Sequence, residues 1–214
     1  MDPQQAVVAL PAIMMAVILH EYAHGWMAYK MGDPTAKEAG RLTLNPIPHI
    51  DLFGTIILPA LLMLLSSPIL FGWAKPVPIN PLRFRNLRYG TFFVSIAGIL
   101  MNLFLAIFFA ILFRLIKEGY LNFLGDPIIL PLALFSAQAV LINLVLAFFN
   151  AIPIPPLDGS RALMSFFSVK YWELFYRFET YGFLIITVLL FTGVLGRIIF
   201  PPILFLWNYL LGRI

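Results

Sequence analysis

The sequence predicts an all-α polytopic membrane protein, and three observations lead to this fold class. Of the 214 residues, 61% are hydrophobic and only 11% are charged, whereas soluble domains carry roughly 25% charged residues. Mean hydropathy is +0.93. Apolar windows near or above the ~20 residues of a membrane-spanning helix recur along the chain. They cover residues 5–27, 52–72, 91–116, 128–152 and about 178–212. We expect about five transmembrane helices in a single membrane-embedded domain, residues 1–214.

The composition also excludes several classes of protein. The net charge of +4 is expected to reflect basic loops beside the membrane, and no nucleic-acid partner is expected. The chain has no cysteine, so disulfides and thiolate metal ligands are excluded. The N-terminal stretch lacks the basic region of a cleaved signal peptide and is expected to remain as the first span.

The first window contains residues that are costly inside a membrane. His20-Glu21-x-x-His24 lies near its C-terminal end, and ionisable residues in a span cost about 2.5–3.5 kcal/mol each. Residues four apart share one helix face. His20 and His24 are therefore expected to hold a common metal ion, with Glu21 as a general base for water. The alternative is a histidine pair hydrogen-bonded within a helix bundle.

Two polar loops flank the second window. Alternation in residues 39–44 predicts a short membrane-associated extended region near 39–50, which would pair with an unwound peptide. The loop at 73–90 is expected to face anionic lipid headgroups through its basic side chains. These are Lys75, Arg83, Arg85 and Arg88.

Prolines interrupt the chain after the window 128–152. In NAIPIPPLDG, residues 150–159, regular helix is expected to end near Asn150 and to resume at Asp158. A catalytic zinc takes three protein ligands, and without cysteine the third is His, Asp or Glu. The candidates are His49, Asp51, Glu118, Asp126, Asp158, Glu173 and Glu179. Asp158 has the most unusual surroundings, because irregular backbone at membrane depth lines a cavity. Its alternative role is a helix N-cap.

The last apolar stretch predicts C-terminal helices over about 174–213. The stretch makes either one span or a pair of spans that turns near Gly193 and Gly196, with a break at Pro201-Pro202.

HEYAH at 20–24 together with NAIPIPPLDG at 150–159 resembles the site-2 protease family of intramembrane zinc metalloproteases. Gly98 and Asn102 match a Gly-Pro-x-x-Asn element of that family, with isoleucine in place of the proline. The resemblance covers about residues 8–165, the expected catalytic core. It points to the compact prokaryotic branch, which lacks the PDZ and CBS domains of some relatives.

The resemblance implies one Zn²⁺ per chain, held by His20, His24 and Asp158, with Glu21 as the base. It also implies that Asn150 binds the substrate backbone or the developing oxyanion.

Two further side chains are assigned by the same resemblance or by their place in the sequence. Asn102 is a second candidate for substrate binding, and its alternative is an interhelical hydrogen bond. His49 is expected either to hydrogen-bond to a zinc ligand without binding the metal itself, or to be a loop histidine near the membrane interface.

The activity that the resemblance implies is hydrolysis of peptide bonds within or near transmembrane segments of membrane-anchored substrates. The expected partners are transmembrane proteins or peptides and the lipid bilayer, with room for a regulatory partner or an oligomer. The competing class is a membrane protein that binds or transports metal ions. A transporter more usually shows repeat-related broken helices, which the sequence lacks, and it has no need of Glu21.

The shared metal ion constrains the topology. The C-terminal ends of the windows 5–27 and 128–152 must face the same side of the membrane. Residues 52–72 are therefore expected to form a re-entrant segment, broken at Pro59 and at Ser66-Ser67-Pro68. This arrangement gathers most Lys and Arg residues on the side of the site. The positive-inside rule then predicts a cell-membrane protein with its active site toward the cytoplasm and its N-terminus outside.

Overall fold

The computed structural model describes residues 3–58, 61, 64 and 74–212, and every regular element within these ranges is a helix. The α-helices are α1 (Pro3–Met31), α2 (Thr35–Glu38), α4 (Leu87–Lys117), α5 (Asp126–Asn150), α6 (Asp158–Met164), α7 (Trp172–Phe191) and α8 (Val194–Leu210). The other helical turns are η1 (Ile47–His49), η2 (Leu52–Ile57), η3 (Pro81–Arg83), η4 (Asn122–Leu124) and η5 (Val169–Tyr171). The all-α class expected from the sequence is confirmed for this part of the chain.

Three helices are long and apolar enough to cross a membrane, as judged by length and composition. They are Val8–Met31 within α1, with 24 residues, α4 with 31 and α5 with 25, against the ~20 that a span needs. A fourth crossing results if Val169–Glu179 and Tyr181–Phe191, which meet at 52°, count as one broken span. The protein is thus a multi-pass membrane protein, with three or four crossings in the described residues where about five were expected.

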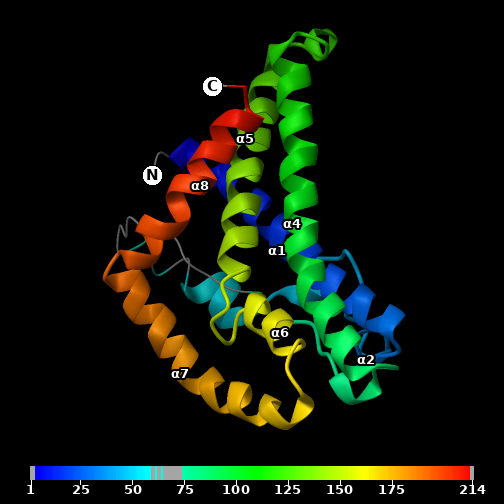
Figure 1. The fold of residues 1–214 in the computed structure, drawn as a ribbon. Helices are drawn as coiled ribbons and strands as arrows, with labels where there is room; N and C mark the ends of the chain where they lie inside the picture. The colour runs from blue at the N-terminus through cyan, green and yellow to red at the C-terminus, as the bar shows by residue number, and fades with distance from the viewer. Residues whose placement is uncertain (1–2, 59–60, 62–63, 65–73, 213–214) are drawn as a thin grey trace.

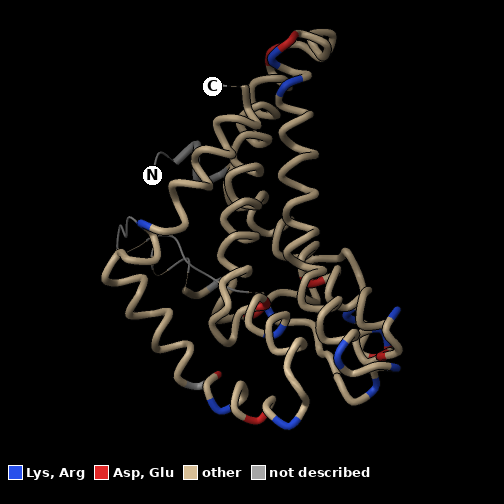
Figure 2. The backbone as a smooth tube through the Cα atoms, viewed as in Figure 1, with Lys and Arg blue, Asp and Glu red and all other residues tan. Residues whose placement is uncertain are grey.

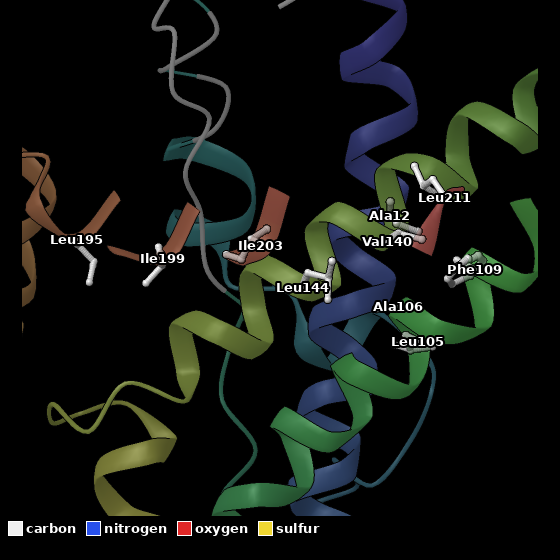
Figure 3. Close-up of a cluster of buried hydrophobic side chains, with 12 residues drawn as sticks. Ala12, Leu105, Ala106, Phe109, Val140, Leu144, Leu195, Ile199, Ile203 and Leu211 are labelled. Atoms are coloured by element: carbon white, nitrogen blue, oxygen red, sulfur yellow. The ribbon is translucent and has the colours of Figure 1, made fainter. Parts of the chain in front are cut away.

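The three long helices pack into a bundle (Figure 1), and alanines on each of them are buried within it. Ala12 of α1 and Ala139 of α5 are 0% exposed, and Ala106 of α4 is 1% exposed. Small residues at such interfaces let helix backbones approach closely. Helix α8 joins the same apolar cluster through Ile199 and Ile203 (Figure 3).

Two helices, α7 and α8, form the C-terminal part of the chain. Helices α7 and α8 follow one another from the end of the molecule near α6 to the end where α4 finishes (Figure 1). Gly193 has a left-handed φ of 71° and bends the chain between them without reversing it. The carbonyl oxygens of Tyr209 and Leu210 each accept a hydrogen bond from the Arg114 guanidinium at 2.6 Å. Because Arg114 lies near the C-terminal end of α4, these bonds place the end of α8 beside that end of α4.

Much of the expected re-entrant segment 52–72 lies outside the described residues, including its expected break points Pro59 and Ser66-Ser67-Pro68. The chain on its two sides is described. There the backbone N–H of Lys75 donates to the carbonyl oxygen of His49 at 2.9 Å. The chain therefore returns after residue 73 to the place that it left near residue 50.

Residues 39–44 do not form the expected extended edge, and no β-strand occurs among the described residues. The backbone N–H groups of Ala39 and Arg41 bond back to the carbonyl oxygens of Thr35 and Ala36, at 2.9 and 2.8 Å. Gly40 between them has a positive φ of 65°. The chain leaves α2 in a tight turn because these local bonds compete with an extended conformation.

Charged side chains gather at one end of the molecule (Figure 2). That end contains α2, the start of α4 and the start of α7, whereas few charges lie where α4 finishes. The middle of the bundle is almost free of charge outside the site described below.

Candidate metal centre

Helix α1 presents two histidines on one face. His20 and His24 are one turn apart, each 7% exposed, and their Nε2 atoms lie 2.9 Å apart. Both side chains therefore point toward one spot inside the bundle, as the four-residue spacing predicts.

Gly98 of α4 makes room for these two rings. An ideal Cβ at this position would lie 2.5 Å from Cε1 of His20 and 2.5 Å from Nε2 of His24. Carbon atoms in contact prefer about 3.5–4.0 Å, so any side chain here would displace both rings. Glycine at 98 is thus a steric requirement of the histidine pair.

A third side chain reaches the same spot from the far side of the proline stretch. Helix α5 ends at Asn150 and α6 begins at Asp158, because the intervening prolines supply no backbone N–H for a helix. The Oδ2 atom of Asp158 lies 3.2 Å from Nε2 of His20 and 3.2 Å from Nε2 of His24. Among the described residues, His20, His24 and Asp158 form the one group of metal-ligand side chains that converge in this way.

Asp158 supplies the third ligand atom as a carboxylate, and the ionised carboxylate is the form that binds metal ions.

The donor set fits a cation such as zinc. Nδ1 of each histidine faces an oxygen acceptor, Asn102 Oδ1 for His20 at 2.6 Å and the Val94 carbonyl for His24 at 2.7 Å. In neutral rings, both Nε2 atoms then carry lone pairs toward Asp158. Asp158 Oδ2 is buried without a hydrogen bond. With the rings in this form, three electron-rich atoms converge on one spot, and a shared cation would relieve their repulsion.

The spacing of these atoms agrees with that interpretation. Zinc binds nitrogen and oxygen ligands at about 2.0–2.2 Å in tetrahedral geometry, which implies ligand-to-ligand distances of about 3.3 Å. The three separations of 2.9, 3.2 and 3.2 Å are close to this value.

Asn102 does not line a substrate cleft, contrary to one sequence expectation. Its side chain is 0% exposed, and besides His20 it contacts Asn143 of α5, with Nδ2 to Oδ1 at 2.8 Å. The reason is the rotation of α4, which turns this position into the bundle. Asn143 was not identified from the sequence, although a polar residue within an apolar span was the signal that could have found it.

Glu21 is held by a segment that the sequence did not connect to it. The backbone N–H of Val77 donates to Glu21 Oε2 at 2.8 Å, and the flanking Pro76 and Pro78 have no N–H to offer. The Arg41 guanidinium anchors this segment by donating to the carbonyl oxygens of Lys75 and Pro76, at 2.7 and 3.3 Å.

The two other expected site residues lie apart from the three converging atoms. Asn150 is half-buried, and its Nδ2 donates to the Leu146 carbonyl of its own helix at 3.0 Å. His49 is 1% exposed, and its Nε2 lies 3.0 Å from the carbonyl oxygen of Thr43. His49 thus contacts its own loop and supports neither histidine of the centre, because the loop at 43–49 folds on itself.

The chain is similar to known proteins that are named as zinc metalloproteases. Residues 124–193 match the model of peptidase family M50. The chain is 38% identical over 189 residues to the putative zinc metalloprotease YwhC of Bacillus subtilis, covering 88% of this chain and 82% of that protein. It is 28% identical over 198 residues to the putative zinc metalloprotease Rip2 of Mycolicibacterium smegmatis, covering 92% and 71%. It is 31% identical over 157 residues to Rip2 of Mycobacterium tuberculosis, covering 73% and 56%. No solved structure matches the chain significantly.

Proposed function

The chain belongs to peptidase family M50, the site-2 protease family, and from this premise we propose that it is a zinc endopeptidase that cuts membrane-anchored substrates within or near their spans. One observation carries the proposal: His20, His24 and Asp158 converge inside the helix bundle, and Glu21 directly follows His20 in the chain. Three metal ligands and a glutamate that acts as general base are the side chains that a zinc metallopeptidase requires.

One Zn²⁺ per chain would be held by His20 Nε2, His24 Nε2 and Asp158 Oδ2. Bound there, zinc would polarise the scissile carbonyl and make water more acidic. The chain's own contribution is the arrangement of the three ligands, which come from α1 and α6, and Gly98 of α4 leaves space for the two histidine rings.

Glu21 would act as the general base. One carboxylate oxygen, Oε2, is held by the Val77 N–H, which leaves Oε1 to take the proton from attacking water and later to give it to the leaving amine. Because a hydrogen bond fixes one oxygen, the carboxylate keeps its orientation.

Asn150 would bind the substrate backbone or the developing oxyanion. Its amide donates one hydrogen to the Leu146 carbonyl, and an asparagine side chain has two N–H hydrogens. The second is therefore available for substrate. The half-buried side chain sits at the end of α5, where the proline stretch leading to Asp158 begins.

A transmembrane substrate must unwind before it is cut, because a helix bonds its own peptide carbonyls. The membrane-embedded position of the three ligands suits such a substrate. Unwound backbone would find hydrogen-bonding partners in the irregular segments around the centre, including the proline stretch after α5.

The site would face the cytoplasm of a cell-membrane protein. The clustering of charge at the end near α2 and the start of α4 supports this orientation by the positive-inside rule. The bond between Lys75 N–H and the His49 carbonyl supports a re-entrant course for 52–72, because the chain leaves and returns at one place.

The proposal is tested with purified protein in lipid vesicles and a transmembrane peptide as substrate. Glu21→Gln is expected to abolish cleavage while one zinc per chain remains, because Glu21 is a base and not a ligand. Asp158→Ala is expected to lose both zinc and cleavage. Glu38→Gln, which removes an exposed carboxylate paired with Arg83 at 2.7 Å, serves as the control and should cleave normally.

The outcome that contradicts the proposal is cleavage by Glu21→Gln at the wild-type rate, or full zinc content in Asp158→Ala. If Glu21→Gln is inactive as expected, comparison of membrane-peptide fragments from cells with wild-type protein and with Glu21→Gln would identify the substrates.

A further inference from the structure

Two asparagines form a continuous hydrogen-bonded chain behind one of the histidines. Asn102 of α4 and Asn143 of α5 are both 0% exposed. Burying an amide without partners is costly, and here both are bonded. Asn102 Oδ1 meets His20 Nδ1 at 2.6 Å, and Asn102 Nδ2 donates to Asn143 Oδ1 at 2.8 Å.

The direction of every hydrogen bond in this chain follows from its far end. Asn143 Nδ2 lies 2.8 Å from the carbonyl oxygen of Ala139, and a carbonyl oxygen only accepts. Asn143 must therefore turn its amide nitrogen to Ala139 and its oxygen to Asn102. Asn102 must in turn offer N–H to Asn143, and its own oxygen then faces His20. A weaker bond from Asn102 Nδ2 to the Ala16 carbonyl, at 3.3 Å, favours the same direction.

The consequence falls on His20. A ring nitrogen that faces an amide oxygen at 2.6 Å must carry the hydrogen, so Nδ1 is the donor and Nε2 is the nitrogen turned to Asp158. We infer that Asn102 and Asn143 are positioning residues, which fix the ring of His20 with hydrogen on Nδ1 and with Nε2 directed into the metal centre. Asn143 acts on His20 only through Asn102, because its contact is with Asn102 and not with the ring.

The packing of α5 against α4 explains why Asn143 can reach Asn102. Ala139 and Ala147 lie one helical turn before and after Asn143, and they are 0% and 1% exposed. Small residues on this face bring the helix backbones close enough for two short amide side chains to meet. The chain of bonds thus begins at a backbone group of α5 and ends at a ligand on α1.

His24 provides an internal control. Its Nδ1 is held by the backbone carbonyl of Val94 at 2.7 Å, independently of either asparagine. Loss of the asparagine chain should therefore affect the ring of His20 and spare that of His24. A general loosening of the bundle would affect both rings.

The test uses two readouts on the full-length protein in detergent micelles, with histidine nitrogens isotopically labelled. Since the chain has only 3 histidines, each ring is resolved by NMR and assigned by single substitutions. The first readout is the Nδ1–H signal of His20, recorded with and without added zinc. The second is zinc affinity, measured by competition with a fluorescent chelator.

Asn102→Leu is expected to remove the exchange-protected Nδ1–H signal of His20 and to weaken zinc binding by about 10- to 100-fold, the range for residues that hold a ligand from behind. Asn143→Leu should weaken the same signal and zinc affinity less, because the Ala16 carbonyl still restrains Asn102. Ser136→Ala is the matched control. It removes another 0%-exposed polar side chain of α5, one bonded within its own helix to Leu132, and should change neither readout.

An unchanged His20 signal in folded Asn102→Leu, or equal changes at His20 and His24, would overturn the inference. Its importance for catalysis rests on the proposed zinc site, but the ring signal does not. A wild-type protein that binds no zinc would contradict the proposed function while leaving the His20 readout intact.

Discussion

Substitution of Gly98 by alanine should empty the metal centre while leaving the bundle folded. The new Cβ would lie 2.5 Å from His20 Cε1 and from His24 Nε2, and 2.7 Å from His20 Nδ1. Restoring contacts of about 3.5 Å requires each ring to retreat by about 1 Å. Metal ligands must hold their distances within about 0.2 Å. The required shift is several times larger than the centre tolerates.

We expect Gly98→Ala to lower zinc affinity by about 100-fold or more, the upper end of the range for residues that support ligands. Its stability should fall only moderately. Overpacking costs about 1–3 kcal/mol, and alanine regains about 1 kcal/mol of helix propensity over glycine. The assay is competition for zinc with a fluorescent chelator, combined with thermal unfolding of the same detergent-solubilised samples.

Gly90→Ala is the matched control. It adds the same methyl group to the same helix, at a position where Cβ would lie 2.5 Å from Cδ2 of Phe84 and away from the histidines. The two variants should lose similar stability, and Gly98→Ala alone should lose zinc. Folded Gly98→Ala that binds zinc within about twofold of wild type would refute the steric reasoning.

Three further outcomes are expected. Val77→Pro, which deletes the N–H bonded to Glu21, should lower turnover by about ten- to a hundredfold at unchanged zinc content, as for loss of a hydrogen bond to a charged group, whereas Val77→Ala should retain most activity. Gly182→Ala should lower turnover, because its Cβ would collide with the Pro155 carbonyl in the stretch that carries Asp158; wild-type turnover would contradict this. A cysteine at Arg85 should be labelled from the cytoplasm by an impermeant reagent, and one appended at the C-terminal end from outside.

The histidine pair and the irregular stretch before Asp158 could be predicted because each depends on local geometry. A four-residue spacing places His20 and His24 on one helix face whatever surrounds the helix. Prolines end regular helix wherever they cluster, so Asp158 had to follow an irregular stretch. Neither inference needed the packing of α1 against α4.

Asn102 and the C-terminal helices show where sequence reasoning stops. The sequence places a polar side chain within the window 91–116. Whether it faces a cleft or another helix depends on the rotation of α4, which is set by contacts across the bundle. The direction of α8 likewise depends on Arg114, at a distance of 96 residues from Leu210. No periodicity within 174–213 reports such a contact, so the sequence leaves the number of C-terminal spans open.

Helix α4 serves the histidine pair through three positions that are four residues apart. The Val94 carbonyl holds His24, Gly98 gives space to both rings, and Asn102 holds His20. Four-residue steps keep all three on one face of α4, just as His20 and His24 share one face of α1. The pairing runs in opposite directions along the two helices, since the earlier histidine meets the later α4 position. One face of α4 thus supplies a hydrogen-bond acceptor at Val94, space at Gly98 and a second acceptor at Asn102. This order leaves the Nε2 atoms of both histidines free to point into the metal centre. Orientation of the two histidine rings is therefore a property of the α1–α4 interface.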